Sequence, residues 1–324
     1  MKNTEKPILL ERAADAMRQY IDAVATFEAY EEALTEAAQV RGGMYWHKGP
    51  ESAPNAVYLV RTSPGGSEKS LGPRSSETEA IYASFRQRKE SAEQRLDGLK
   101  TALVKHKRMN RALRVGRVAP LIVEILNRLS ATRLGEHFRV VGTHALYAYE
   151  SAAGVTFDDA AVATRDIDLL WDVRKRVAFA TALNHVDTSM LGVLRKVDPS
   201  FRIRSSQKYT AVNKDGFEVD IIRREQVADD PHPVRLSADE EDFWVVQAPR
   251  AQELLDSPQF SAVIVATNGD MARMNTLDPM AFVRFKQWMS TLPERDPLKR
   301  RRDALQARVV EEVVREYLPH LAKD

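Results

Sequence analysis

The sequence predicts an α/β (α+β) protein in which a mixed sheet with flanking helices is preceded by a helical hairpin domain carrying a small β-hairpin. Two features predict this arrangement. Up to about residue 110, apolar residues recur every three or four positions over two long stretches, which is typical of helices that bury one face. After residue 111, short apolar runs of strand length alternate with helical stretches. The boundaries that we expect are 1–110, 111–240 and 241–324.

The first region should consist of two helices and an inserted hairpin. One helix is expected at 8–40, and a second begins at Ser76, where Glu79 completes a capping box. Between them, the aromatic and β-branched runs 44–47 and 57–60 predict the two strands of the hairpin. The helices are expected to pair antiparallel within the chain. The apolar stripe of the first helix also suits the alternative of a homodimer through the N-terminal helices.

The remaining elements should form the mixed sheet and its covering helices. In chain order we expect a helix at 118–129, a strand at 138–141, a glycine turn, a helix at 145–151, strands at 166–171, 202–206, 209–213, 217–222, 243–247 and 262–267, and helices at 279–289 and 297–317.

Composition excludes several classes of protein. The chain has no cysteine, so it has neither disulfides nor a thiolate zinc site. No apolar run approaches the roughly 18 residues that would span a bilayer, and the first residues lack the apolar core of a secretion signal. We therefore expect a cytoplasmic protein with no membrane partner. The net charge of +2 says little about nucleic acid, because local clustering creates a binding face.

Asp166-Ile167-Asp168 is the most informative tripeptide in the chain. Alternate residues of a strand point to one face, so the two carboxylates should project side by side. Their repulsion is relieved by a cation, and Mg²⁺ (or Mn²⁺) prefers such oxygen ligands. Asp220, on a neighbouring strand, would add a third carboxylate, and Glu218 is a weaker candidate of the same parity. The alternative is a pair of solvated acids on an edge strand.

A glycine turn precedes the acidic strand. Gly142 and Thr143 lie between an apolar strand and a helix, where backbone N–H groups and the Thr143 hydroxyl can bind phosphate oxygens. His144 can donate to the same phosphate, although a single histidine at a helix start more often packs or caps. A plain tight turn is the alternative for the whole segment.

The order of glycine turn, Asp-x-Asp strand and later Asp strand resembles the DNA polymerase β superfamily of nucleotidyltransferases. The resemblance implies a polymerase β-like fold, an NTP substrate, and catalytic and metal-binding roles for Asp166, Asp168 and Asp220. It also implies that Gly142 and Thr143 bind the nucleotide phosphates. The stretches 141–150 and 163–170 look more closely like a bacterial nucleotidyltransferase-fold family, whose members also carry N-terminal segments similar to Tyr45-Trp46 and 69–75.

The C-terminal helices extend the resemblance. Lys286, followed by Arg295-Asp296 and by 299–303, is similar to the motifs of AbiEii-type nucleotidyltransferase toxins. This resemblance implies that Lys286 neutralises the triphosphate, that Asp303 supports the site or acts as a base, and that the protein is a toxin or defence protein. The alternative is an amphipathic helix with Lys286 in water and surface ion pairs between Arg and Asp.

Cationic residues suggest where an acceptor binds. A run without acids ends the second helix, and three of its side chains share a face: Lys107, Arg111 and Arg114. Such a face could follow an RNA or tRNA backbone, or it could simply be solvated. The hairpin mixes aromatic and cationic side chains (Tyr45, Trp46, Lys48, Tyr58 and Arg61), which suits base stacking but also plain cross-strand packing.

The expected function is transfer of an NMP from an NTP to an unidentified acceptor, which is RNA or tRNA, a protein or a small molecule. In this interpretation 1–110 binds the acceptor or a partner, 111–240 is the nucleotidyltransferase core, and 241–324 completes the NTP site. The competing hypothesis is a non-catalytic nucleotidyltransferase-fold module that binds RNA or a partner protein. The presence of all three carboxylates argues against that module.

Overall fold

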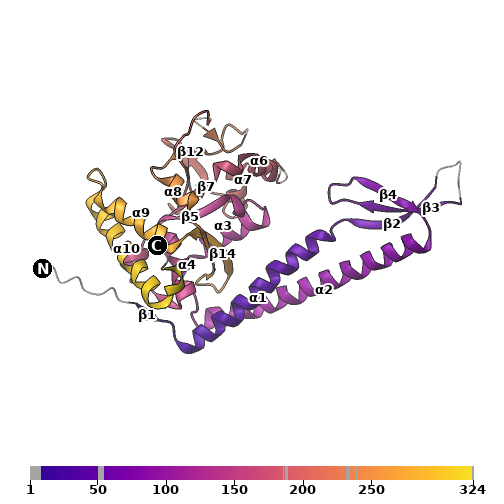
Figure 1. Cartoon of the computed structure of the whole chain (residues 1–324), viewed down its shortest axis with the longest axis horizontal. Helices are drawn as coiled ribbons and strands as arrows, with labels where there is room; N and C mark the ends of the chain where they lie inside the picture. Colours follow the sequence, from indigo (N-terminus) through magenta and orange to yellow (C-terminus); the bar gives the residue numbers. More distant parts are fainter. Residues whose placement is uncertain are drawn as a thin grey trace. The chain divides into compact units, whose positions relative to one another are not determined.

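The computed structural model describes residues 9–49, 55–184, 186, 189–230, 234–237 and 239–322. The chain divides into two compact units. The small unit is Arg18–Met109, and the large unit combines Met1–Met17 with Asn110–Asp324. Each unit has its own sheet (Figure 1).

The small unit is built on an antiparallel pair of helices. They are α1 (Ala14–Gln39) and α2 (Ser76–Ala112). The ring of His106 is 3.0 Å from the Gln19 amide and 3.1 Å from the Thr26 hydroxyl, while Arg95 donates to Glu36 at 2.6 Å. Residues near the start of α1 therefore meet the end of α2, and residues near the end of α1 meet earlier residues of α2. The predicted antiparallel pairing is confirmed.

A three-stranded antiparallel sheet follows α1. Its strands, in the order β2-β3-β4, are β2 (Gly43–Lys48), β3 (Val57–Thr62) and β4 (Glu68–Pro73). The predicted hairpin is confirmed, with one strand more than expected. The sequence of β4 is Glu-Lys-Ser-Leu-Gly-Pro, which lacks the β-branched and aromatic residues that mark a strand. The Trp46 ring packs against Tyr82 of α2 at 5.6 Å.

Two local predictions in this region are wrong. The capping box of α2 lies one residue earlier than expected: Ser75 and Thr78 exchange hydrogen bonds, and Glu79 pairs with Arg74 at 2.8 Å. The first helix starts at Ala14 and not near residue 8, because Leu10–Glu11 forms strand β1 against β6 (Val155–Thr156).

The large unit contains a mixed nine-stranded sheet. Its main path runs β11-β12-β10-β7-β5-β14-β13, β9 pairs with β10, and β8 pairs with β9. The strands are β5 (Phe138–Val141), β7 (Asp166–Trp171), β8 (Arg202–Arg204), β9 (Gln207–Val212), β10 (Glu218–Arg223), β11 (Val234–Arg235), β12 (Trp244–Gln247), β13 (Gln259–Val265) and β14 (Met271–Leu277). β7 runs parallel to β10 and antiparallel to β5, so the sheet is mixed, as predicted.

Helices flank this sheet and connect its strands. They are α3 (Pro120–Ala131), α4 (Leu146–Ala153), α5 (Asp159–Val162), α6 (Arg176–Asn184), α7 (Met190–Arg195), α8 (Ala251–Asp256), α9 (Pro279–Thr291) and α10 (Pro297–Tyr317). Short 3₁₀ turns precede β5, α4 and α6 and follow α10. No helix among the described residues is both long enough and apolar enough to cross a membrane.

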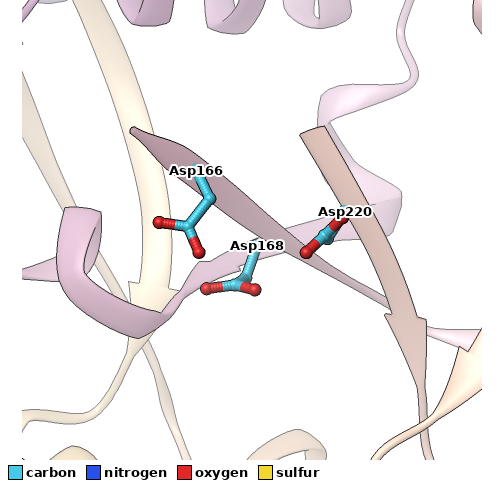
Figure 2. A group of neighbouring side chains, drawn as sticks. All are labelled: Asp166, Asp168 and Asp220. Atoms are coloured by element: carbon cyan, nitrogen blue, oxygen red, sulfur yellow. The ribbon is translucent and has the colours of Figure 1, made fainter. Parts of the chain in front are cut away.

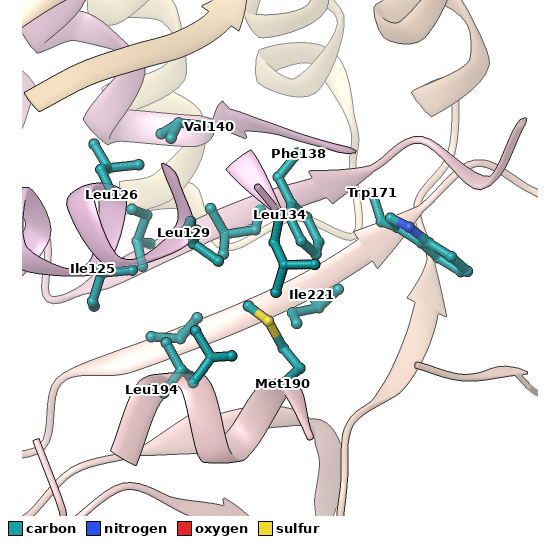
Figure 3. Packing of buried hydrophobic residues seen from close by; sticks show 14 of the residues in the cluster. Ile125, Leu126, Leu129, Leu134, Phe138, Val140, Trp171, Met190, Leu194 and Ile221 are labelled. Atoms are coloured by element: carbon teal, nitrogen blue, oxygen red, sulfur yellow. The ribbon is translucent and has the colours of Figure 1, made fainter. Parts of the chain in front are cut away.

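The sheet of the large unit separates two hydrophobic clusters. Ile167 and Leu169 of β7 join α3, α6 and α7 in one cluster, part of which is drawn in Figure 3. Leu170 points to the opposite face and joins a second cluster with α4, α9 and α10. Asp166 and Asp168 have the parity of Leu170, so they project from the face that α4, α9 and α10 cover.

Candidate functional site

Three carboxylates from two strands converge on one face of the large sheet (Figure 2). Asp166 and Asp168 are alternate residues of β7, and Asp220 lies on β10 directly opposite Asp168 in the parallel register. One oxygen from each carboxylate lies within 4.8 Å of the other two. The prediction that Asp220 lies on a strand next to that of Asp166 and Asp168 is therefore confirmed. The three side chains form a compact acidic group.

The surroundings of the three carboxylates differ. The Thr164 hydroxyl donates to Asp166, and the Thr210 hydroxyl donates to Asp220. Burial, followed by repulsion from Asp166 and Asp220, raises the pKa of Asp168 to about 7. Burial also raises the pKa of Asp220, although the bond from Thr210 opposes this rise. Three charges so close together are unfavourable unless a cation or a proton compensates them.

The donor set fits a divalent metal ion. All three groups offer carboxylate oxygens, which are the ligands that hard cations of the Mg²⁺ class prefer. Each is partly exposed, so an ion can reach the group from solvent. The acidic triad could therefore hold a metal, and the bound ion would replace mutual repulsion with attraction.

Gly142 lies against the triad. It follows β5 with a φ of +69°, a left-handed conformation that favours glycine. A Cβ atom built there would lie only 2.1 Å from Oδ2 of Asp168. Only glycine therefore lets the turn pass so close to the carboxylate. Sequence reasoning singled out this residue for phosphate binding, and its contact with Asp168 is a second requirement that the sequence did not reveal.

Thr143 and His144 are both buried beside Gly142. The Thr143 hydroxyl accepts a hydrogen bond of 3.0 Å from Gln306 of α10, which also donates to the Ala161 carbonyl at 2.7 Å. Gln306 is fully buried and ties the turn to α10. Sequence reasoning missed Gln306. The available signal was its position three residues after Asp303, which places both on one face of the helix.

His144 is part of an aromatic stack. Its ring is nearly parallel to the rings of Tyr147 and Phe217, whose centroids are 5.7 Å and 6.3 Å away. Burial lowers its pKa to about 4, so the ring is neutral at pH 7. Neither ring nitrogen has a hydrogen-bond partner. This environment is that of a packing residue, and a contact between His144 and a phosphate stays a prediction.

Lys286 and Asp303 meet inside the large unit. Lys286 Nζ donates to Asp303 at 2.8 Å, and Arg295 Nε donates to the other carboxylate oxygen at 2.5 Å. Asp303 is fully buried and Lys286 is only 5% exposed, so the alternative of a lysine facing water is wrong. Burial lowers the pKa of Lys286, while attraction to Asp303 and then to Asp168 raises it. Lys286 and Arg295 therefore lie close enough to the triad to lower the pKa of Asp168.

The cationic run lies at the end of α2. Lys107 and Arg111 are exposed residues of this helix. The helix ends at Ala112, and Arg114 follows it with a φ of +51°. The prediction that Arg114 shares a helix face with the other two is wrong, because the backbone has already left the helix.

Comparison with known families identifies part of the chain. The family model described as nucleotidyltransferase matches residues 121–324, which include the acidic triad, the glycine turn and the Lys286–Asp303 pair. No curated protein and no solved structure matches the chain.

Proposed function

The chain belongs to the nucleotidyltransferase family, which implies NTP binding, and from this premise we propose that it transfers an NMP from an NTP to an acceptor and releases pyrophosphate. The observation that carries the proposal is the convergence of Asp166, Asp168 and Asp220 within 4.8 Å inside the matched region. Such a cluster suits a metal ion, which is what phosphoryl transfer to and from a triphosphate needs.

Each residue of the triad has a proposed role. Asp166 and Asp168 would hold Mg²⁺ or Mn²⁺, which, when bound, supplies positive charge for the triphosphate and its reacting oxygens. Asp220 would assist in binding the ion and accept the proton of the acceptor hydroxyl. The acceptor oxygen bonds to the α-phosphorus, the α–β phosphoanhydride bond breaks, and pyrophosphate leaves.

The triphosphate would lie between the glycine turn and the two cations of the large unit. Gly142 and Thr143 offer backbone N–H groups at the start of a 3₁₀ turn. Lys286 and Arg295 offset negative charge near Asp168, as their effect on its pKa indicates. Asp303 holds both cations in place and is a positioning residue in this arrangement.

The test is NMP transfer from each α-labelled NTP, incubated with Mg²⁺ and total cell extract. We expect label in one class of acceptor with the native protein and none with Asp166→Ala/Asp168→Ala. The matched control is Asp229→Ala, which removes an exposed acid outside the triad. Equal transfer by the double variant would show that the site is wrongly assigned.

The division of labour remains part of the proposal. Region 1–110 would bind or orient the acceptor, 111–240 would hold metal and NTP, and 241–324 would complete the NTP site with Lys286. The basic side chains at the end of α2 motivate this division. Similarity of the Lys286 and Asp303 segment to AbiEii-type toxins suggests that the acceptor belongs to a toxin or defence reaction. NTP binding without product on long incubation would favour a non-catalytic module instead.

A further inference from the structure

Trp244, at the start of β12, lies beside two cations. Lys208 Nζ is 5.4 Å and Arg235 Cζ is 5.8 Å from the centroid of the indole ring. Both cations are exposed, and Trp244 is partly exposed. A ring with cations at this distance is held by cation–π attraction, and the same three groups can stack on a planar ligand and meet its negative charge.

The register of the sheet places Trp244 on the face of the acidic triad. Ile222 of β10 lies opposite Val246 of β12, and residues two positions earlier on each strand, Asp220 and Trp244, share that face. Arg235 lies directly opposite Trp244 and therefore projects from the same face. On this edge of β10 Asp220 itself lies opposite Thr210 of β9, so Trp244 lies on the face of the triad but is not the direct neighbour of Asp220.

Lys208 reaches this face from β9. Thr210 of β9 lies opposite Asp220, and Lys208, two residues earlier, has the same parity. Among the residues that the structure describes, no carboxylate pairs with Lys208 or Arg235, whereas the nearby Arg204 is bound to Glu218. The two cations beside Trp244 therefore remain available to an anionic ligand.

The strand order separates this group from the proposed triphosphate site. Along β12-β10-β7-β5, Trp244 lies on the first strand, Asp220 on the second and Asp168 on the third, and Gly142 follows the fourth. Asp220 therefore lies between β7 and β5, which leads to the glycine turn, on one side and the strands that carry Lys208 and Trp244 on the other. A ligand on Trp244 would approach the triad from the side opposite to the phosphates of the NTP.

We propose that Trp244, Lys208 and Arg235 form the subsite for the terminal nucleotide of an RNA acceptor. The base stacks on the indole, and Lys208 and Arg235 bind the adjoining phosphates. An acidic peptide would need the cations but not the ring, whereas stacking explains why a large aromatic side chain stands on this face. The inference deepens the proposed transfer reaction and rests on it for the role of the bound RNA.

The test measures binding of a 5′-fluorescein-labelled single-stranded 12-nucleotide RNA to the full chain by anisotropy. Because stacking on one aromatic side chain contributes roughly 1–3 kcal/mol per base, Trp244→Ala should weaken binding by about tenfold or more, and Trp244→Phe should retain most of the affinity. Lys208→Ala/Arg235→Ala should weaken binding and flatten its salt dependence. Trp288→Ala is the matched control, since Trp288 also has a cation, Arg250, 5.2 Å from its ring.

A second readout does not depend on the alanine variant folding. RNA should quench more tryptophan fluorescence in the native protein than in Trp244→Phe. Equal quenching in both, or unchanged RNA affinity in a folded Trp244→Ala protein, would overturn the subsite. The subsite would also be overturned, in favour of a peptide site, if Lys208→Ala/Arg235→Ala lost transfer to an acidic polypeptide acceptor while Trp244→Ala kept it.

Failure of the subsite and failure of the proposed function remain distinguishable. Transfer of label to a protein or a small molecule, undisturbed by Trp244→Ala, would refute the RNA subsite and leave nucleotidyl transfer intact. Absence of any transfer by the native protein would refute the proposed reaction. RNA binding that still depended on Trp244 would then overturn the inference as stated and identify the group as a binding site only.

Discussion

Gly142→Ala is the substitution that tests the geometry of the site most directly. The backbone at this position has a φ of +69°, and an L-residue in the left-handed region is disfavoured by roughly 1–2 kcal/mol. The new methyl group would also lie 2.1 Å from Oδ2 of Asp168 and 3.2 Å from its Cγ. Because carbon and oxygen atoms need more than 3.0 Å, the carboxylate must move by about 1 Å or the turn must shift.

Such a displacement should affect activity more than stability. A misplacement of about 1 Å in a catalytic group can reduce the rate by roughly 100-fold. We therefore expect NMP transfer to fall by about 100-fold and metal affinity to weaken, while the free energy of unfolding falls by only about 1–2 kcal/mol. The assays are pyrophosphate release with labelled NTP, calorimetric titration with Mg²⁺ and urea unfolding.

Gly216→Ala provides the matched control. Gly216 has a similar φ of +76°, yet a Cβ atom there meets nothing within 4 Å. This variant should lose a similar free energy of unfolding, with transfer close to that of the native protein. If Gly142→Ala keeps its transfer rate and Mg²⁺ affinity within about twofold of the control, the contact between the glycine turn and Asp168 does not position the carboxylate.

Three further predictions concern other parts of the structure. Asp303→Asn leaves Lys286 and Arg295 without a buried negative charge, so urea unfolding should show a loss of about 3 kcal/mol; a loss below about 1 kcal/mol would contradict the buried network. His144 has a pKa of about 4 when folded and about 6.5 when unfolded, so protonation favours the unfolded chain as the pH falls below 6.5. Between pH 7 and pH 5 the free energy of unfolding of the native protein should fall by about 2 kcal/mol more than that of His144→Phe. Equal falls in the two proteins would refute this. Reversing the charges of Lys107, Arg111 and Arg114 should reduce the rate of transfer to an RNA acceptor, and this reduction should depend steeply on salt, as a salt series of transfer rates would show. NTP affinity should stay unchanged, and a loss of NTP affinity would contradict the prediction.

The sequence was sufficient where a local rule decides the outcome. The two-residue period of a strand places Asp166 beside Asp168 in any sheet, whatever surrounds it. The position of Asp220 depended on two runs of strand length becoming neighbours, and the pairing of β7 with β10 confirms that step. The fold class could be predicted for the same reason, because helix and strand periodicities are local properties.

Features that depend on distant contacts were not predictable. The stretch from Arg295 to Asp303 is rich in charge and looks like a solvated surface, yet Asp303 is fully buried because Lys286 and Arg295 both donate to it. Strand β14 has the sequence Met-Ala-Arg-Met-Asn-Thr-Leu, which carries few β-branched residues. It forms through its long antiparallel ladder with β13, a tertiary contact that overrides weak local preference.

The same charges explain why metal and nucleotide should bind together. A triphosphate that approached the triad alone would meet three carboxylates. The cations that act on them are already bound to other carboxylates, Lys286 and Arg295 to Asp303 and Arg204 to Glu218. Burial strengthens this repulsion, as the raised pKa of Asp168 shows. A divalent ion reverses the sign of the local potential and is in turn held more tightly by the added phosphate oxygens. By linkage, each ligand would then raise the affinity for the other by the same factor, so we expect the triad to bind the metal–nucleotide complex more tightly than either component alone.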